Sequence, residues 1–269
     1  MFSGFMLNTW VAATLVAVVA GAVGLFVALR GSSFVAHAVP HGAFGGAAGA
    51  ALLGWNPVLG LGIFAAGGAL SMGWLSRRGR HDVGTALALV TMLGTGALFL
   101  SWSNEYASQV YALLFGEVLG VARGELLPIA GVGAASLGVL ALVARPLLAT
   151  SVLADAAPTR GRGARRVETA FLLLVALATT MSVPVVGALL MFSLMVAPGA
   201  TARLVSDRPG RAAAVSVALA LGIVWSAVAL SYVLNWPVGF FVGTLGALAY
   251  GGGRLLALRR AGAGAPEGG

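Results

Sequence analysis

Cysteine and lysine are both missing from this chain of 269 residues, and aspartate and glutamate together number only 8. Without cysteine the chain has no disulfide framework and no thiolate ligand for a metal. Without lysine it cannot form the phosphate-binding loop that ends in Gly-Lys-Ser or Gly-Lys-Thr. If ATP drives this protein, a separate subunit must hydrolyse it, so we expect no catalytic residue here.

Charge is scarce as well, because only 9% of the residues are charged and 59% are hydrophobic. A soluble domain has about 25% charged residues and is about half apolar. A helix that crosses a bilayer needs about 20 mostly apolar residues, and most of the chain between charged clusters meets that length. The composition predicts an all-α, polytopic transmembrane helix bundle.

The apolar runs predict about eight to nine spanning helices. The least certain boundary is Val183-Pro184, because proline either kinks one long helix or separates two. Residues 106–121 are too short to cross, and we expect a short helix at the outer face. The nine runs are about 7–29, 33–54, 57–76, 83–102, 126–147, 167–182, 184–200, 212–233 and 237–256.

All sixteen basic residues are arginine, and most of them lie in short segments between apolar runs. That pattern follows the positive-inside rule, so the net charge of +8 does not indicate a nucleic-acid partner. With the arginine-rich segments in the cytoplasm, nine spans alternate and the N-terminus lies outside. Trp55, Trp102 and Trp236 then mark the outer interface, and Arg123 is an exception on that side.

Two histidines stand four residues apart within the run 33–54. On a helix, His37 and His41 project from one face. Imidazole pairs bind zinc, copper, iron and nickel, although such a pair can instead bond to nearby carbonyl groups. We therefore take His37 and His41 as candidate metal ligands.

A polar interval at about 150–166 separates two apolar runs, and it suits a short helix that docks on a cytoplasmic partner. It contains Asp155, Ala157 and Gly161. Residues 1–260 are expected to form one transmembrane domain, and residues 261–269 a flexible tail.

Four segments resemble the permeases of the zinc, manganese and iron uptake ABC transporters. The first runs from 24 to 34 and continues to His41 and Gly46. The others are 111–119, which contains Leu114-Phe115-Gly116-Glu117, then 186–204 and 230–239. They occur in the family's order and span nearly the whole chain.

The resemblance implies a fold like that of type II ABC importers, in the cytoplasmic (inner) membrane. It implies partners: a separate ATPase, an extracytoplasmic metal-binding protein, a second permease copy (itself or a paralogue) and membrane lipid. In this family a cytoplasmic segment presses into the ATPase. Ala157 and Gly161 match its alanine and glycine, Asp155 lies beside them, and Val152-Leu153 replaces its opening Phe-Asp.

The family pattern has an aspartate where this chain has His37, while His41 is retained. No acidic residue occurs before Asp82, so a divalent cation between two imidazoles would be uncompensated in a low dielectric. Nitrogen ligands favour zinc over manganese, which prefers oxygen. We expect divalent metal ions as transported cargo, with zinc favoured and manganese or iron next, and no permanently bound cofactor.

Two other classes of protein remain open at this point. An ion-coupled secondary transporter of a small solute or metal complex is also built from many helices. It usually carries acidic residues inside the membrane, and the inner spans here have almost none. A membrane metalloenzyme needs more ligands than two histidines.

Overall fold

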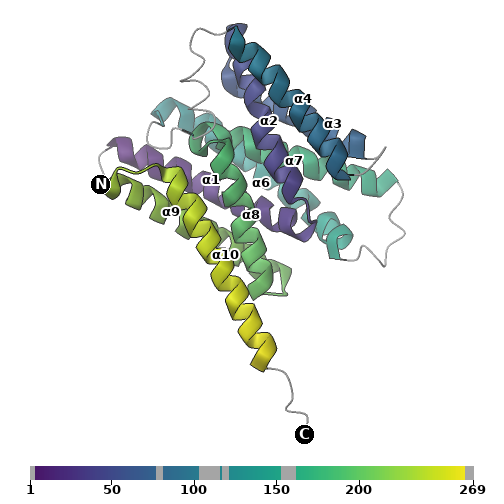
Figure 1. Ribbon diagram of the computed structural model, residues 1–269, viewed down its shortest axis with the longest axis vertical. Helices are drawn as coiled ribbons and strands as arrows, with labels where there is room; N and C mark the ends of the chain where they lie inside the picture. The colour runs from purple at the N-terminus through teal and green to yellow at the C-terminus, as the bar shows by residue number, and fades with distance from the viewer. Residues whose placement is uncertain (1–3, 77–80, 103–115, 117–120, 153–161, 264–269) are drawn as a thin grey trace.

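The computed structural model describes residues 4–76, 81–102, 116, 121–152 and 162–263. Within these ranges the chain is helical and contains no strand, as Figure 1 shows, so the predicted all-α bundle is confirmed. The described helices are α1 (Gly4–Leu29), α2 (Ser33–Leu52), α3 (Pro57–Ser76), α4 (His81–Ser101), α6 (Arg123–Val152), α7 (Arg162–Val186), α8 (Ala188–Val205), α9 (Pro209–Leu234) and α10 (Val238–Ala263).

Eight of these helices are long and apolar enough to cross a membrane, which confirms the prediction of eight to nine spans. The helix that falls short is α2. It has 20 residues and none of them is charged, so low hydropathy alone sets it apart. The cause is its content of glycine, alanine and two histidines in place of large aliphatic side chains.

Neighbouring helices alternate in direction along the chain. The contacts between residues far apart in sequence establish this, because parallel helices pair residues in the same order and antiparallel helices in the reverse order. The parallel pairs, each with two contacts, are α1 with α6 (Asn8–Val121, Arg30–Thr150), α1 with α8 (Gly24–Met195, Ala28–Arg203), α2 with α4 (Gly42–Met92, Gly49–Phe99) and α8 with α10 (Gly239–Leu190, Gly253–Thr201). The antiparallel pairs are α1 with α9 (Thr14–Trp225, Gly21–Ser216) and α3 with α7 (Gly62–Thr180, Gly73–Leu172).

This alternation puts the helix ends that flank the arginine-rich segments at one end of the bundle. Trp55, Trp102 and Trp236 lie at the other end, and each is more than half exposed. Arg123 begins α6 at the tryptophan end, as expected. By the positive-inside rule, the arginine end is predicted to face the cytoplasm.

The boundary between α7 and α8 corrects the sequence-based prediction at Val183-Pro184. Pro184 lies inside α7, and the helix continues until the N–H of Gly187 donates to the carbonyl of Val183 at 2.9 Å. Gly187 has a φ of 84°, which residues with a side chain rarely adopt. The turn between α7 and α8 therefore lies at Gly187. Pro184 removes one hydrogen bond near the end of α7 but does not itself end the helix.

The closest contact of α1 is with α8, through two glycines. A Cβ atom built on Gly24 would overlap the carbonyl oxygen of Met195, and one built on Gly199 would overlap that of Gly24. Lipid gives helices no hydrophobic drive to associate, so small residues that let backbones approach supply the contact instead. The α1–α8 pair is therefore held by backbone proximity.

We expect Gly24→Val to destabilise the bundle by about 1–3 kcal/mol, because overpacking a tight contact forces the backbones apart. Gly67→Val is the matched control, since a Cβ at Gly67 on α3 meets no atom within 4 Å. Thermal unfolding of the purified protein in detergent measures the difference. Equal melting temperatures for the two variants would contradict the role given to Gly24.

Candidate metal site

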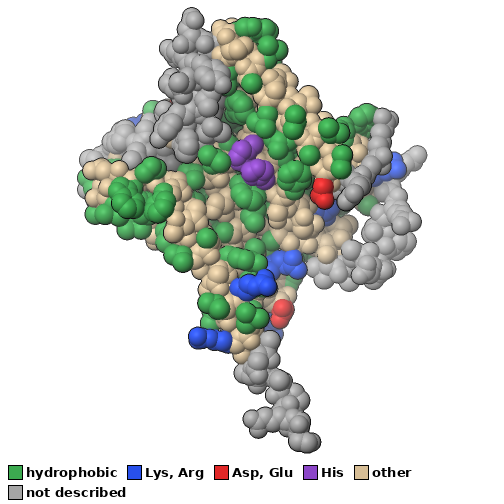
Figure 2. All heavy atoms as spheres, viewed as in Figure 1, with side chains coloured by type: hydrophobic (Ala, Val, Ile, Leu, Met, Phe, Trp, Pro, Cys, Tyr) green, Lys and Arg blue, Asp and Glu red, His purple; other side chains and the backbone are tan. Residues whose placement is uncertain are grey.

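The structure places His37 and His41 together on one face of α2. Their ring centroids are 4.1 Å apart and the ring planes meet at 33°. Both side chains are half-buried, and Figure 2 shows the pair near the middle of the visible face among apolar side chains. The prediction that the two imidazoles share a face is confirmed.

The hydrogen bond of His41 determines which of its nitrogens can bind a metal. Its Nδ1 lies 2.9 Å from the carbonyl oxygen of His37. A carbonyl oxygen only accepts, so this Nδ1 carries the proton and donates it. The lone pair is then on Nε2, and a backbone carbonyl that fixes the tautomer is the arrangement found around metal-binding histidines.

The ring of His37 is held by α8. Phe192 packs edge-on against it, with the ring centroids 4.8 Å apart. The Nδ1 atom of His37 is buried and has no hydrogen-bond partner among the described residues. Two helices that are distant in sequence therefore position this imidazole, and the sequence pattern contained no signal for Phe192.

The two imidazoles are too few to enclose a metal ion alone. Within the described ranges, no three His, Cys, Asp or Glu side chains are grouped closely enough to hold a metal. Zinc sites in proteins have three or four protein ligands. The described residues therefore supply only part of a metal site, and both histidines are partly exposed.

The other candidate residues from the sequence cannot be placed. Asp155, Ala157 and Gly161 lie outside the described residues, as does Glu117. Of the expected outer helix at 106–121, only Gly116 and Val121 are described. Gly116 lies against the backbone of Val186, next to the turn at Gly187.

Arg30 was not singled out from the sequence, yet it links three helices at the arginine end. Its guanidinium donates to Thr150 Oγ1 of α6 at 3.0 Å and lies 5.0 Å from the ring centroid of Phe171 of α7. Burial lowers the pKa of Arg30 from its ordinary value, and the negative charge of Glu168 opposes that shift. The available signal was a lone arginine between two apolar runs.

Arg30 also stands directly before the helix of the histidines. The residues from 30 to 32 join α1 to α2, and Arg203 of α8 donates to the carbonyl of Ala28 at 2.8 Å just before this turn. The turn that leads into α2 is therefore joined to α6 and α7 through Arg30, and the end of α1 just before it is joined to α8. Thr150 lies near the end of α6, directly before the undescribed segment 153–161.

Comparisons with a family model, with known proteins and with solved structures all point to the same family of membrane proteins. The model of the ABC 3 transport family matches residues 3–251. The chelated iron transport system membrane protein YfeC of Yersinia pestis is 31% identical over 91% of this chain and 85% of its own. The manganese transport system membrane protein MntC of Listeria innocua is 25% identical over 88% and 85%. The structure titled PsaBC from Streptococcus pneumoniae in complex with Fab contains a chain with a TM-score of 0.78 and 24% identity, over 95% of this chain and 91% of that one.

We expect Arg30→Gln to loosen the arginine end of the bundle. Loss of the charge removes the ring contact with Phe171 and weakens the bond to Thr150. Hydrogen exchange at the facing ends of α6 and α7 should rise about tenfold, which corresponds to about 1.4 kcal/mol of local stability. Arg165→Gln, which removes the same charge from an exposed position of α7, should leave exchange unchanged.

Proposed function

Because this chain belongs to the ABC 3 transport family, whose model matches residues 3–251, we propose that it is the permease subunit of an ATP-driven importer of divalent metal ions, with zinc as its preferred cargo. The observation that carries the proposal is the imidazole pair of His37 and His41 on one face of α2. Its partners are a separate ATPase and an extracytoplasmic metal-binding protein.

Import across the membrane requires a site that metal can enter and leave. Each imidazole is half-buried, and the bond from His41 Nδ1 to the His37 carbonyl leaves Nε2 of His41 for the metal. Two neutral nitrogen ligands hold a divalent ion weakly enough for release, since among the described residues no carboxylate joins the pair to compensate the charge of the ion. A transport site needs such reversible binding.

A second copy of the permease completes the coordination in this proposal. One chain supplies two imidazoles, and two chains that meet at the exposed face of α2 supply four. Four nitrogen ligands match the tetrahedral coordination of zinc. A paralogous permease with its own ligands on the same helix would serve equally.

The choice of zinc rests on ligand chemistry and departs from the names of the relatives. YfeC is named for chelated iron and MntC for manganese. Manganese prefers oxygen ligands, and His37 stands where the family pattern has an aspartate. Replacing oxygen by nitrogen favours zinc, and so sets this chain apart from a manganese permease.

Membership of the ABC 3 transport family also favours an ABC importer over an ion-coupled secondary transporter. An ABC importer takes its energy from ATP bound by another subunit, so the permease needs neither a nucleotide-binding loop nor acidic residues inside the membrane. We propose that Asp155, Ala157 and Gly161 belong to the segment that contacts this ATPase. Arg30 and Thr150 would then hold the base of that segment against α1.

Uptake of zinc by vesicles that contain the permease, its ATPase and the binding protein tests the proposal. Wild-type vesicles should accumulate zinc only with ATP, and His41→Ala should lower the rate at least about a hundredfold, as expected when a metal ligand is lost. The control is His81→Ala, which changes the histidine that begins α4. Normal zinc uptake by His41→Ala with assembly intact would refute the assignment.

Restoring the aspartate tests the metal preference separately. His37→Asp introduces an oxygen ligand and a negative charge, so the ratio of manganese to zinc uptake should rise by about tenfold, or about 1.4 kcal/mol. The measurement is competition between the two metals in the same vesicles. An unchanged ratio would mean that His37 does not set the preference.

A further inference from the structure

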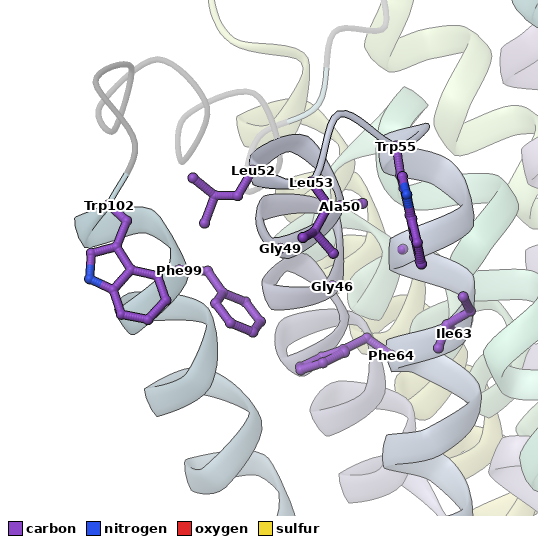
Figure 3. A pocket seen from close by; sticks show the side chains of 11 residues that line it. Gly46, Gly49, Ala50, Leu52, Leu53, Trp55, Ile63, Phe64, Phe99 and Trp102 are labelled. Carbon is purple, nitrogen blue, oxygen red and sulfur yellow. The ribbon is translucent and has the colours of Figure 1, made fainter.

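A cavity of about 340 Å³ opens between α2, α3 and α4, and the metal site does not use it. Figure 3 shows its lining: Phe99 comes from α4, Trp102 directly follows the end of α4, Ile63 comes from α3 and Trp55 from the turn between α2 and α3. Its volume falls within the about 300–1,000 Å³ of typical ligand pockets.

The cavity lies on the opposite side of α2 from the histidines and nearer the tryptophan end. Gly46 of its lining is nine residues after His37, which is about 180° around a helix with 3.6 residues per turn. Gly46 and Gly49 have no side chain to fill the space. A Cβ on Gly49 would come within 2.8 Å of the Phe99 ring, so the glycines also set how closely α4 approaches.

Among the described residues the lining has no titratable side chain, and its polar groups there are the backbone and the two indole N–H groups. A cavity without polar partners does not hold ordered water. The lining is also continuous with an apolar outer surface, since Leu59 and Ile63 of α3 and Leu98 of α4 are 64%, 63% and 48% exposed. In a bilayer, such a surface faces hydrocarbon.

The depth of the cavity matches that of the upper part of an acyl chain. Trp55 and Trp102 lie at its mouth, at the tryptophan end of the bundle, and are 59% and 64% exposed. Indole rings prefer the level of the lipid headgroups. Gly46 of α2 and Ile63 of α3 lie farther from the tryptophan end of their helices, toward the middle of the membrane.

We propose that this cavity is a phospholipid site, in which one acyl chain inserts between α3 and α4 against the glycines of α2 and the headgroup lies between Trp55 and Trp102. The bound chain supports the back of the helix whose front carries His37 and His41. The proposal is independent of which cargo the protein carries. A second copy of this chain is a poorer occupant, because the proposed contact between copies uses the opposite face of α2.

The test uses the full-length protein in nanodiscs that contain a trace of phosphatidylcholine with a diazirine on one acyl chain. After irradiation, labelled residues are located by mass spectrometry. A diazirine near the carboxyl end should label the level of Trp55 and Trp102, and one at the chain terminus should label Gly46, Gly49 and Ile63. Both yields should exceed those on exposed residues of α3 and α4 outside the cavity.

Filling the cavity should remove this excess label. Ile63→Trp places a large ring in the deep part of the cavity, at an exposed position of α3, so labelling of the cavity residues should fall at least about fivefold. Leu53→Trp is a second filling variant if the first fails to fold, and Leu70→Trp is the control on α3 outside the cavity. If residues of the cavity and exposed residues of α3 and α4 outside it are labelled equally, the label comes only from lipid that surrounds the protein, and the proposal is overturned. Crosslinks between two chains at this face overturn it as well.

Discussion

The close approach of α1 and α8 is the contact on which the rest of the structure depends. Without a hydrophobic drive between helices in lipid, the pair is held where Gly24 and Gly199 let the backbones meet. This contact sets the position of α8, and α8 in turn brings Phe192 against His37 and Arg203 to the carbonyl of Ala28. The orientation of the His37 ring is therefore a consequence of two glycines on other helices.

Much of this fold could be predicted because its signals are local. A run of about 20 apolar residues identifies a span by itself, and the positions of the arginines predict the direction in which each span crosses the membrane. The helical period puts His37 and His41 on one face whatever surrounds them. The turn at Gly187 was misplaced because its backbone conformation depends on packing, including the contact of Gly116 with Val186, and Pro184 gave a stronger local signal.

The features that sequence could not predict all join segments far apart in the chain. Phe192 lies about 150 residues after His37, and Thr150 is 120 residues after Arg30. No periodicity specifies such pairs, because each follows from how the helices pack. The bond from Arg30 to Thr150 likewise connects the end of α6 to the turn from which α2 begins. Only the three residues 30–32 separate α1 from the helix of the histidines.

The low hydropathy of α2 becomes intelligible when its two faces are considered together. Large aliphatic side chains would make it a better isolated span, but they would fill the space that both faces require. The front carries the two histidines, and the back carries glycines that let α3 and α4 approach and still leave a cavity. With so few large apolar side chains of its own, α2 depends on its neighbours for stability. Movement of those neighbours would then move the histidines, as the transport function proposed above requires.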